Sequence, residues 1–332
     1  MATRIGSRTL KLKTKIALVT GAAGFIGSQL VRALLKRGFV VYGVDNFITG
    51  RRENIAPFLA NPKFNFFELD IVNPDFLETF SKIPVGEIYH LACPTGVPNI
   101  ARLGEEMMLA SAIGTRHVLE LARRHNARII FTSSSEIYGE AVVTPQDEDY
   151  AGNVNPIGPR SAYEEGKRFA ESLITAHVRK YGVDADIVRL FNVYGPGMSP
   201  DDQRVIPRFL KSIERGEPLT IYGDGAQTRT FCYIDDLIQG LELVMAKGSQ
   251  GKVYNLGSGR EVKIRDLAEL VVSLSRHRGG IIHQPHFIQD HLHRKPSLAK
   301  IHKLGWRETI PLTEGLKRTI AAWGIPRVMG HE

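Results

Sequence analysis

A tyrosine and a lysine four residues apart could carry out acid–base chemistry in this chain. They open and close the segment Tyr163-Glu-Glu-Gly-Lys167, inside a stretch (161–181) that we expect to be helical. Residues i and i+4 of a helix project from the same face. A nearby ammonium group favours a phenolate, so we expect Lys167 to lower the pKa of Tyr163 from its usual value near 10. Tyr163 could then act as a general base at a hydroxyl. The spacing alone is common by chance and also fits an ordinary surface pair.

A run of hydroxyl residues upstream makes the catalytic interpretation stronger. The segment Thr132-Ser-Ser-Ser-Glu136-Ile-Tyr-Gly139 follows an apolar run (128–132) that is typical of a buried strand. In a doubly wound parallel sheet, ligands bind at the carboxyl ends of the strands. We therefore expect Ser134 and Glu136 to lie near Tyr163. For Glu136, the alternative is an ordinary loop carboxylate or a cap.

Three spaced glycines indicate a site for a nucleotide. The segment Gly21-Ala-Ala-Gly24-Phe-Ile-Gly27 lies between the apolar run 15–20 and a helical pattern. Glycine allows a tight turn and close approach to a pyrophosphate, and a helix N-terminus presents free N–H groups to that anion. A simple helix-packing turn is the alternative, but the order strand, glycines, helix, strand and acid is much more specific.

The acid in that order is Asp45, which ends the second apolar run (39–44). A carboxylate at this place can accept hydrogen bonds from a ribose and would repel a 2′-phosphate, so it favours NAD over NADP. Arg51 and Arg52 follow closely and leave NADP open as the minority alternative.

Strands that alternate with helices define the fold class. Further strand-like runs cover residues 64–71, 87–92, 128–132 and 185–191, and helical stretches cover 104–125 and 161–181. The pattern predicts an α/β protein with a doubly wound parallel sheet of the Rossmann type.

The second half of the chain predicts a smaller C-terminal α/β lobe. We expect a helix at 205–215, strands at 219–222 and 253–256, a helix from an Asp235 N-cap to Ala246, and a helix at 263–275. The domains would be a basic tail (1–14), a Rossmann domain (15–195) and a substrate lobe (196–332), with about 230–258 returning to the Rossmann domain. The boundary falls at the turn-rich Gly195-Pro196-Gly197.

Composition narrows the class of protein. The chain has 332 residues, of which 43% are hydrophobic, and a formal net charge of +8. There is no long apolar run for a membrane span and no signal-peptide core, and only Cys93 and Cys232 are present, which favours a cytoplasmic protein. Lys and Arg are scattered, apart from those in the tail, so we expect no nucleic-acid partner; a mildly basic surface also suits a phosphate-bearing substrate.

Several longer stretches resemble the extended short-chain dehydrogenase/reductase family of NAD-dependent sugar-nucleotide epimerases, dehydratases and decarboxylases. The resemblance runs from residue 15 to the final helix near Trp323 and is nearest to the UDP-glucuronate decarboxylases, or UDP-xylose synthases. The matching stretches are His90-Leu-Ala-Cys-Pro94, Ser135-Glu-Ile-Tyr-Gly139, Asn155-Pro-Ile-Gly-Pro-Arg160, Tyr163-Glu-Glu-Gly-Lys-Arg168, Gln227-Thr-Arg229 and Arg294-Lys-Pro296.

The resemblance implies a reaction. Tyr163, assisted by Ser134, would deprotonate the sugar C4 hydroxyl while a hydride passes to NAD⁺. The resulting 4-ketone makes the C6 carboxylate a β-keto acid that loses CO₂. Protonation at C5 and return of the hydride would then give UDP-xylose.

Three positions discriminate among the sister activities. Ser135 stands where a 4,6-dehydratase would carry an Asp, and Glu136 is usually missing from simple 4-epimerases. Arg294 matches an arginine that faces the sugar carboxylate, which it could bind bidentately. A solvated loop charge is the alternative for Arg294.

The resemblance also implies the binding residues. The NAD contacts would be Gly21, Gly24, Phe25, Ile26, Gly27, Asp45, Asn46, Asp70, Ile71, Leu91, Ala92, Tyr163 and Lys167. The UDP-sugar contacts would be Pro94, Asn192, Val205, Tyr222, Gln227, Arg229 and Arg294. Tyr222 could equally be core packing. A homodimer is implied through the helices at 104–125 and 161–181.

Some segments depart from the family pattern. Asp290-His-Leu-His293 replaces an Asp-Asp-Pro pattern, Ser297 stands where Asp is frequent, and Thr95-Gly-Val-Pro98 matches only approximately. With His283 and His286 these histidines raise the question of a metal, but their spacing lacks a rigid ligand pair, so we expect no metal. UDP-glucuronate 4-epimerase is the main alternative activity, followed by another sugar-nucleotide dehydratase or epimerase, and then by a non-catalytic NAD-binding protein.

Overall fold

A seven-stranded parallel sheet forms the centre of the molecule. The computed structural model describes residues 15–275, 277–285 and 294–325. The strand order is β11-β6-β5-β4-β1-β2-β3. The strands are β1 (Ile16–Thr20), β2 (Val40–Asp45), β3 (Phe64–Glu68), β4 (Glu87–His90), β5 (Arg128–Ser134), β6 (Ala185–Leu190) and β11 (Val253–Leu256). The sheet confirms the predicted doubly wound fold.

The central strands are apolar on both faces because helices cover both. In β1, Ala17, Leu18 and Val19 are fully buried. Ala17 and Val19 face one hydrophobic cluster and Leu18 faces the other, as the alternation of a strand requires.

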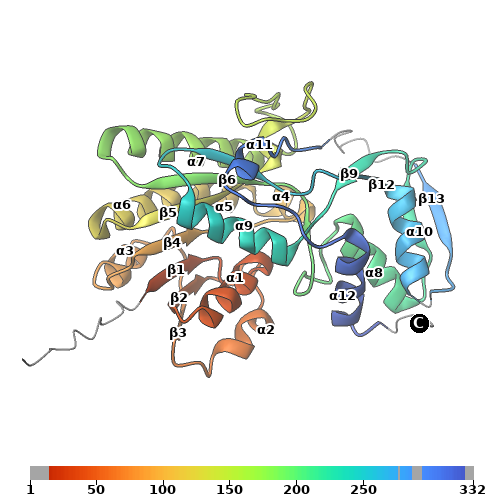
Figure 1. Ribbon diagram of the computed structural model, residues 1–332, viewed down its shortest axis with the longest axis horizontal. Coiled ribbons are helices and arrows are strands. Elements are labelled where there is room, and N and C mark those ends of the chain that lie inside the picture. The colour runs from red at the N-terminus through yellow and green to blue at the C-terminus, as the bar shows by residue number, and fades with distance from the viewer. Residues whose placement is uncertain (1–14, 276, 286–293, 326–332) are drawn as a thin grey trace, which may run out of the picture.

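Two groups of helices cover these faces (Figure 1). On one side, α1 (Phe25–Lys36) packs against α9 (Ile234–Lys247). On the other, α6 (Thr115–His125) packs against α3 (Asp75–Phe80) and α7 (Ser161–Tyr181). The glycine turn before α1 and the Tyr163–Lys167 pair on α7 thus belong to elements on opposite faces of the sheet. They meet only at the carboxyl edge of the sheet.

The predicted helix at 104–125 is interrupted in the structure. It consists of α5 (Gly104–Leu109), a π-helical turn, η2 (Ala110–Gly114), and α6. At Gly114 a side chain would overlap Ile71, so the turn brings backbone close to the strand ends. Interruptions of this kind are frequent near functional sites.

The C-terminal lobe lies at the right of Figure 1. It contains α8 (Val205–Arg215), β8 (Leu219–Tyr222), β9 (Thr228–Thr230), β12 (Glu261–Lys263), α10 (Ile264–Leu274), β13 (Ile281–Gln284) and α12 (Leu312–Ala322). Strand β13 pairs parallel with β8, and β12 pairs antiparallel with β9. Between these elements the chain adds α9 and β11 to the layers of the large sheet.

The remaining elements are short. They are α2 (Arg52–Ile55), η1 (Ala56–Phe58), α4 (Val97–Arg102), η3 (Ser135–Tyr138), β7 (Val193–Tyr194), β10 (Cys232–Tyr233) and α11 (Ala299–Lys303). Strand β10 pairs with β7 and leads directly into α9.

The predicted N-cap of α9 is wrong. Tyr233 occupies the N-cap, the helix begins at Ile234, and Asp235 lies inside the first turn. An acidic residue there still complements the helix dipole. The neighbouring Asp236 accepts hydrogen bonds from the backbone N–H groups of Thr309 and Ile310, at 3.1 and 2.8 Å, and so ties α9 to the C-terminal segment.

Candidate functional site

The glycine turn after β1 has the shape that a pyrophosphate requires. Gly21 has a φ of +72°, and its N–H donates to the carbonyl of Val44 at 2.8 Å. At Gly27 a side chain would overlap the carbonyl of Gly21, so only glycine lets α1 approach the turn. The N-cap of α1 is Gly24, which has no side chain that could occupy the free N–H groups of the first turn. The residues present therefore suit the diphosphate of a dinucleotide.

Asp45 is held beside this turn. Its Oδ2 accepts from the N–H of Ala23 at 3.0 Å and its Oδ1 from the N–H of Phe47 at 2.8 Å. Burial raises the pKa of the Asp45 carboxyl above its ordinary value, and the backbone N–H groups act in the opposite direction. Its place at the end of β2 suits an adenosine ribose.

The two nearby arginines have acidic partners. Arg52 binds Glu68 at 2.8 Å, and its guanidinium lies 4.1 Å from the centre of the Phe47 ring. Arg51 lies 3.4 Å from Glu53. A 2′-phosphate would have to compete with these carboxylates, which weakens the NADP alternative.

A cleft of about 700 Å³ follows the carboxyl edge of the sheet. All thirteen residues predicted to contact NAD line it, from Gly21 at one end to Lys167 at the other. Ser134, Glu136 and Arg294 also line it. The structure therefore brings together every predicted cofactor and catalytic residue.

Lys167 is fixed in the wall of this cleft. Its Nζ donates to the carbonyl of Thr132 at 2.9 Å and lies 6.0 Å from the centre of the Tyr163 ring. Only 3% of Lys167 is exposed. Burial lowers the pKa of the Lys167 ammonium, whereas Cys93 and Glu171 raise it.

The expected direction of the Tyr163 pKa is wrong for the isolated chain. Burial is the largest effect and raises the pKa of Tyr163 above 10, and the negative forms of Cys93 and Glu136 raise it further. The Ser134 hydroxyl and the charge of Arg204 act in the opposite direction. Desolvation of the phenolate therefore outweighs the nearby positive charge.

Glu136 and Arg294 contact each other directly. The two guanidinium nitrogens of Arg294 bind the two Glu136 oxygens, with Nη2 and Oε2 2.9 Å apart. The side chain of Arg294 is only 11% exposed, so it is no solvated loop charge. Arg294 was expected to face a sugar carboxylate; its fork already holds one carboxylate, that of Glu136.

A second arginine completes this cluster. Arg160 Nη2 lies 2.6 Å from Glu136 Oε2, and Arg160 Nε lies 3.3 Å from Glu164 Oε1. Burial raises the pKa of Glu136, but the charges of Arg294 and Arg160 outweigh it and lower the pKa to about 2. The sequence reasoning assigned no role to Arg160. The sequence feature that could have indicated Arg160 is its place three residues before Tyr163.

The predicted substrate residues fall into two groups. Pro94, Asn192 and Arg294 line the cleft. Val205, Tyr222, Gln227 and Arg229 belong to the C-terminal lobe and do not line it.

Within the lobe, Tyr222, Gln227 and Arg229 contact their own neighbours. Gln227 Nε2 donates to the carbonyl of Tyr222 at 2.9 Å, and the Tyr222 ring lies 4.6 Å from the guanidinium of Arg208. Arg229 Nη1 donates to the carbonyl of Thr228 at 2.8 Å. Arg204 and Cys93, which were not predicted as site residues, line the cleft instead.

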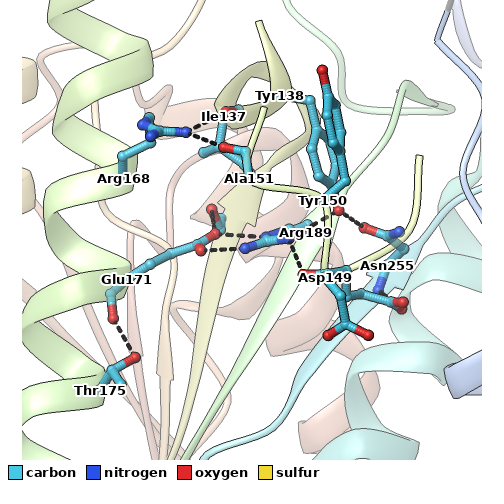
Figure 2. Close-up of polar contacts among 12 residues, drawn as sticks. Ile137, Tyr138, Asp149, Tyr150, Ala151, Arg168, Glu171, Thr175, Arg189 and Asn255 are labelled. Atoms are coloured by element: carbon cyan, nitrogen blue, oxygen red, sulfur yellow. Dashed lines mark hydrogen bonds and ion pairs between the residues drawn. The ribbon is translucent and has the colours of Figure 1, made fainter. Parts of the chain in front are cut away.

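A buried polar network joins the elements that carry the site (Figure 2). Arg189 on β6 binds Glu171 on α7 through two hydrogen bonds, of 2.7 and 3.0 Å. The hydroxyl of Ser133, beside Ser134, donates to the same carboxylate at 2.5 Å. Because Glu171 lies one helical turn beyond Lys167, the network fixes α7 against the end of β5.

The same network continues to the segment of Arg294. Arg189 Nη1 binds the Tyr138 hydroxyl at 3.0 Å, and that hydroxyl donates to Asn255 at 2.8 Å (Figure 2). Asn255 donates to the carbonyl of Gln146 at 3.0 Å. Gln146 in turn accepts from the N–H of Lys295 at 2.9 Å, directly after Arg294.

Within the described part of the chain, no three His, Cys, Asp or Glu side chains gather as metal ligands. His283 Nδ1 lies 2.8 Å from the carbonyl of Gly223. His286, the departing segment 290–293 and the basic tail 1–14 lie outside the described residues. No helix among the described residues has the length and apolar character to cross a membrane.

Comparison with known proteins gives the class. The model of the NAD dependent epimerase/dehydratase family matches residues 17–257, and the chain belongs to that family. It is therefore an NAD-dependent enzyme that modifies sugar nucleotides, which confirms the predicted family and cofactor.

Individual relatives agree with this assignment. UDP-glucuronic acid decarboxylase 1 of Arabidopsis thaliana is 42% identical over 96% of this chain and 70% of its own length. Among solved structures, UDP-glucose 4-epimerase of Thermotoga maritima has a TM-score of 0.85 at 30% identity, covering 93% of this chain and 98% of the other. The NAD-bound dTDP-glucose 4,6-dehydratase of Streptomyces venezuelae has a TM-score of 0.81 at 29% identity, covering 93% and 97%.

Proposed function

We propose that the enzyme decarboxylates UDP-glucuronate to UDP-xylose through a 4-keto intermediate. One observation carries the proposal: Glu136 and Arg294 form a carboxylate–guanidinium pair in the same cleft as Tyr163 and Lys167. An arginine fork at this place suits a sugar that carries a carboxylate. The 42% identity to a UDP-glucuronic acid decarboxylase supports the same reading.

Tyr163 would remove the proton of the C4 hydroxyl, and the Ser134 hydroxyl would position that oxygen. When bound, NAD would supply the hydride acceptor at C4 and, once reduced, the hydride donor, and the positive charge of its oxidised ring would favour the phenolate. Lys167 holds positive charge beside Tyr163 and, through Thr132, fixes the end of β5. General-base help of this kind contributes about 10²–10⁴-fold in rate.

Arg294 would then orient the C6 carboxylate of the 4-keto sugar. The bond from C5 to the carboxyl carbon breaks, CO₂ leaves, and the electron pair passes to the ketone as an enolate. A proton then adds at C5, and return of the hydride to C4 completes UDP-xylose. Ser135, in place of a proton-donating Asp, leaves the site without the acid that loss of water would need.

We also propose that residues 196–332 mainly bind the sugar nucleotide. Asn192 lines the cleft and would contact the diphosphate. The uridine and its phosphates would contact the lobe at Val205, Tyr222, Gln227 and Arg229. Val205 lies on α8, Tyr222 on β8, Gln227 in the turn between β8 and β9, and Arg229 on β9.

Turnover of UDP-glucuronate with catalytic NAD⁺ tests the proposal. Release of CO₂ together with UDP-xylose supports it. Formation of UDP-galacturonate without CO₂ would replace it by 4-epimerisation. UDP-glucose serves as the neutral control, because it offers Arg294 no carboxylate and should release nothing. Absence of any sugar-nucleotide turnover would favour a non-catalytic NAD-binding protein.

A further inference from the structure

Arg160 contacts the reaction cleft, yet the mechanism above gives it no role. It directly precedes α7, and its guanidinium binds Glu136 at 2.6 Å and Glu164 at 3.3 Å. The three side chains are 17%, 12% and 5% exposed. Arg160 is therefore a shielded cation whose charge acts on Glu136.

Glu136 thus bridges two arginines that belong to different parts of the chain. Both guanidinium groups contact Oε2, and Arg294 also contacts Oε1. A substrate carboxylate that is to be held by the Arg294 fork must displace the Glu136 carboxylate from it. A guanidinium fork matches one carboxylate bidentately, so the two acids compete for it.

The outcome of this competition depends on Arg160. If Arg294 were the only cation at Glu136, its departure would leave a shielded carboxylate without a counter-charge, which is strongly unfavourable. With Arg160 bound to Oε2, Glu136 keeps a counter-charge while Arg294 turns to the substrate. We propose that Arg160 is a positioning residue: it keeps Glu136 paired while Arg294 exchanges the Glu136 carboxylate for the carboxylate of the substrate.

This exchange also determines specificity. A hexuronate brings its own carboxylate, so the total number of arginine–carboxylate pairs is restored after Arg294 has moved. A neutral hexose brings none, so opening the Glu136–Arg294 pair is uncompensated and Arg294 stays with Glu136. The inference rests on the proposed function, because it assumes a sugar nucleotide that carries a carboxylate.

The variants Arg160→Gln and Arg160→Lys test the inference, and Arg318→Gln is the matched control. Arg318 also pairs with acidic side chains, Glu314 and Asp235, but lies on the exposed face of α12, 45% exposed. We expect Arg160→Gln to raise the KM for UDP-glucuronate by at least about tenfold. Arg160→Lys should recover part of the loss, and Arg318→Gln should behave like the wild type.

A pH profile separates positioning from simple structural support. Arg294 and Arg160 together outweigh burial and hold the pKa of Glu136 at about 2, so removal of Arg160 should raise that pKa. The acid limb of kcat/KM should therefore move to higher pH in Arg160→Gln and move back in Arg160→Lys. Thermal unfolding of each variant shows whether the fold is intact. An unchanged KM and an unchanged acid limb in a folded Arg160→Gln protein would overturn the inference.

Binding distinguishes failure of this inference from failure of the proposed function. If the wild type releases no CO₂, the proposed function fails, and calorimetric titration of the NAD⁺ complex still tests Arg160. The inference predicts that Arg160→Gln weakens binding of UDP-glucuronate and leaves binding of UDP-glucose unchanged. Equal weakening of both ligands, or of neither, would contradict it.

Discussion

At the residue scale, the properties of Tyr163 depend on what surrounds its hydroxyl. Burial keeps its pKa above the ordinary value, and the negative form of Cys93 adds to the effect. The Ser134 hydroxyl and the charge of Arg204 lower this pKa, but they do not outweigh burial. A pKa raised in this way keeps the Tyr163 phenol protonated at neutral pH.

Replacement of this tyrosine should remove catalysis and leave the fold. We expect Tyr163→Phe to lower kcat by about 10²–10⁴-fold, because the general base is lost. Titration of NAD⁺ should show similar affinity, since the aromatic ring remains. Steady-state kinetics measure the first effect and calorimetry the second. A variant with more than a tenth of wild-type kcat would show that Tyr163 is not the base.

At this scale, site residues can be predicted from the sequence where backbone conformation dictates the residue type. Gly21 and Gly27 follow from positive φ and close approach, and Asp45 follows from its place at the end of β2. The pairing of Arg294 with Glu136 was not predictable, because the two residues are 158 positions apart and meet only through the tertiary fold.

At the scale of elements, the pair Arg189–Glu171 holds α7 on the sheet. It lies within the network of Figure 2, and the Glu171 carboxylate also accepts a hydrogen bond from Ser133. Both side chains are nearly buried, at 10% and 12% exposure. A carboxylate in this setting is costly to replace, because the remaining guanidinium would keep its charge without its partner.

We therefore expect Glu171→Gln to destabilise the protein by about 3–5 kcal/mol. The control is Glu165→Gln on the same helix, where a carboxylate that is 33% exposed lies 3.6 Å from Arg168. Such a pair contributes about 0–1 kcal/mol. Urea denaturation followed by circular dichroism measures both changes. Equal losses in the two variants would show that the buried pair has no special part in stability.

Element boundaries show where local patterns stop being informative. The stretch 104–125 has the composition of one helix, but packing of Gly114 against Ile71 accompanies a π-helical turn. Asp235 has the type of an N-cap residue, yet the pairing of β10 with β7 places Tyr233 there. In both cases a tertiary contact outweighs a local preference.

At the scale of the molecule, the helical segments α5, η2 and α7 expose large apolar side chains. Met108 on α5, Ile113 in η2 and Phe169 on α7 are exposed at 48%, 39% and 52%. Exposed apolar side chains on neighbouring helices are typical of an interface. They belong to the two helical segments through which the sequence predicts a homodimer.

Light scattering during size-exclusion chromatography tests the dimer. We expect twice the 36.9 kDa mass of one chain at micromolar concentration. Phe169→Glu should shift the protein towards the monomer, because a carboxylate would be buried in the interface. Leu59→Glu is the matched control. Leu59 is 58% exposed, but it directly follows η1 and belongs to neither of the two helical segments. A monomeric wild type, or equal shifts in the two variants, would contradict this interface.

The layers of the sheet were predictable at this scale, whereas the placement of the lobe residues was not. Alternating apolar runs give a parallel α/β sheet from the sequence alone. Tyr222 and Arg229 depend on how the lobe faces the cleft, which no local pattern encodes. In the structure, the Tyr222 ring contacts the guanidinium of Arg208, and Arg229 donates a hydrogen bond to the carbonyl of Thr228.

One mass-spectrometric measurement tests the central claim most directly. The substrate is UDP-glucuronate labelled with ¹³C at C6 and with deuterium at C4, incubated with enzyme and unlabelled NAD⁺. The account predicts that ¹³CO₂ is released and that the UDP-xylose formed keeps deuterium at C4, because the hydride returns to the carbon it left. A product that retains the ¹³C carboxylate, or a UDP-xylose that has lost the deuterium, would contradict the account.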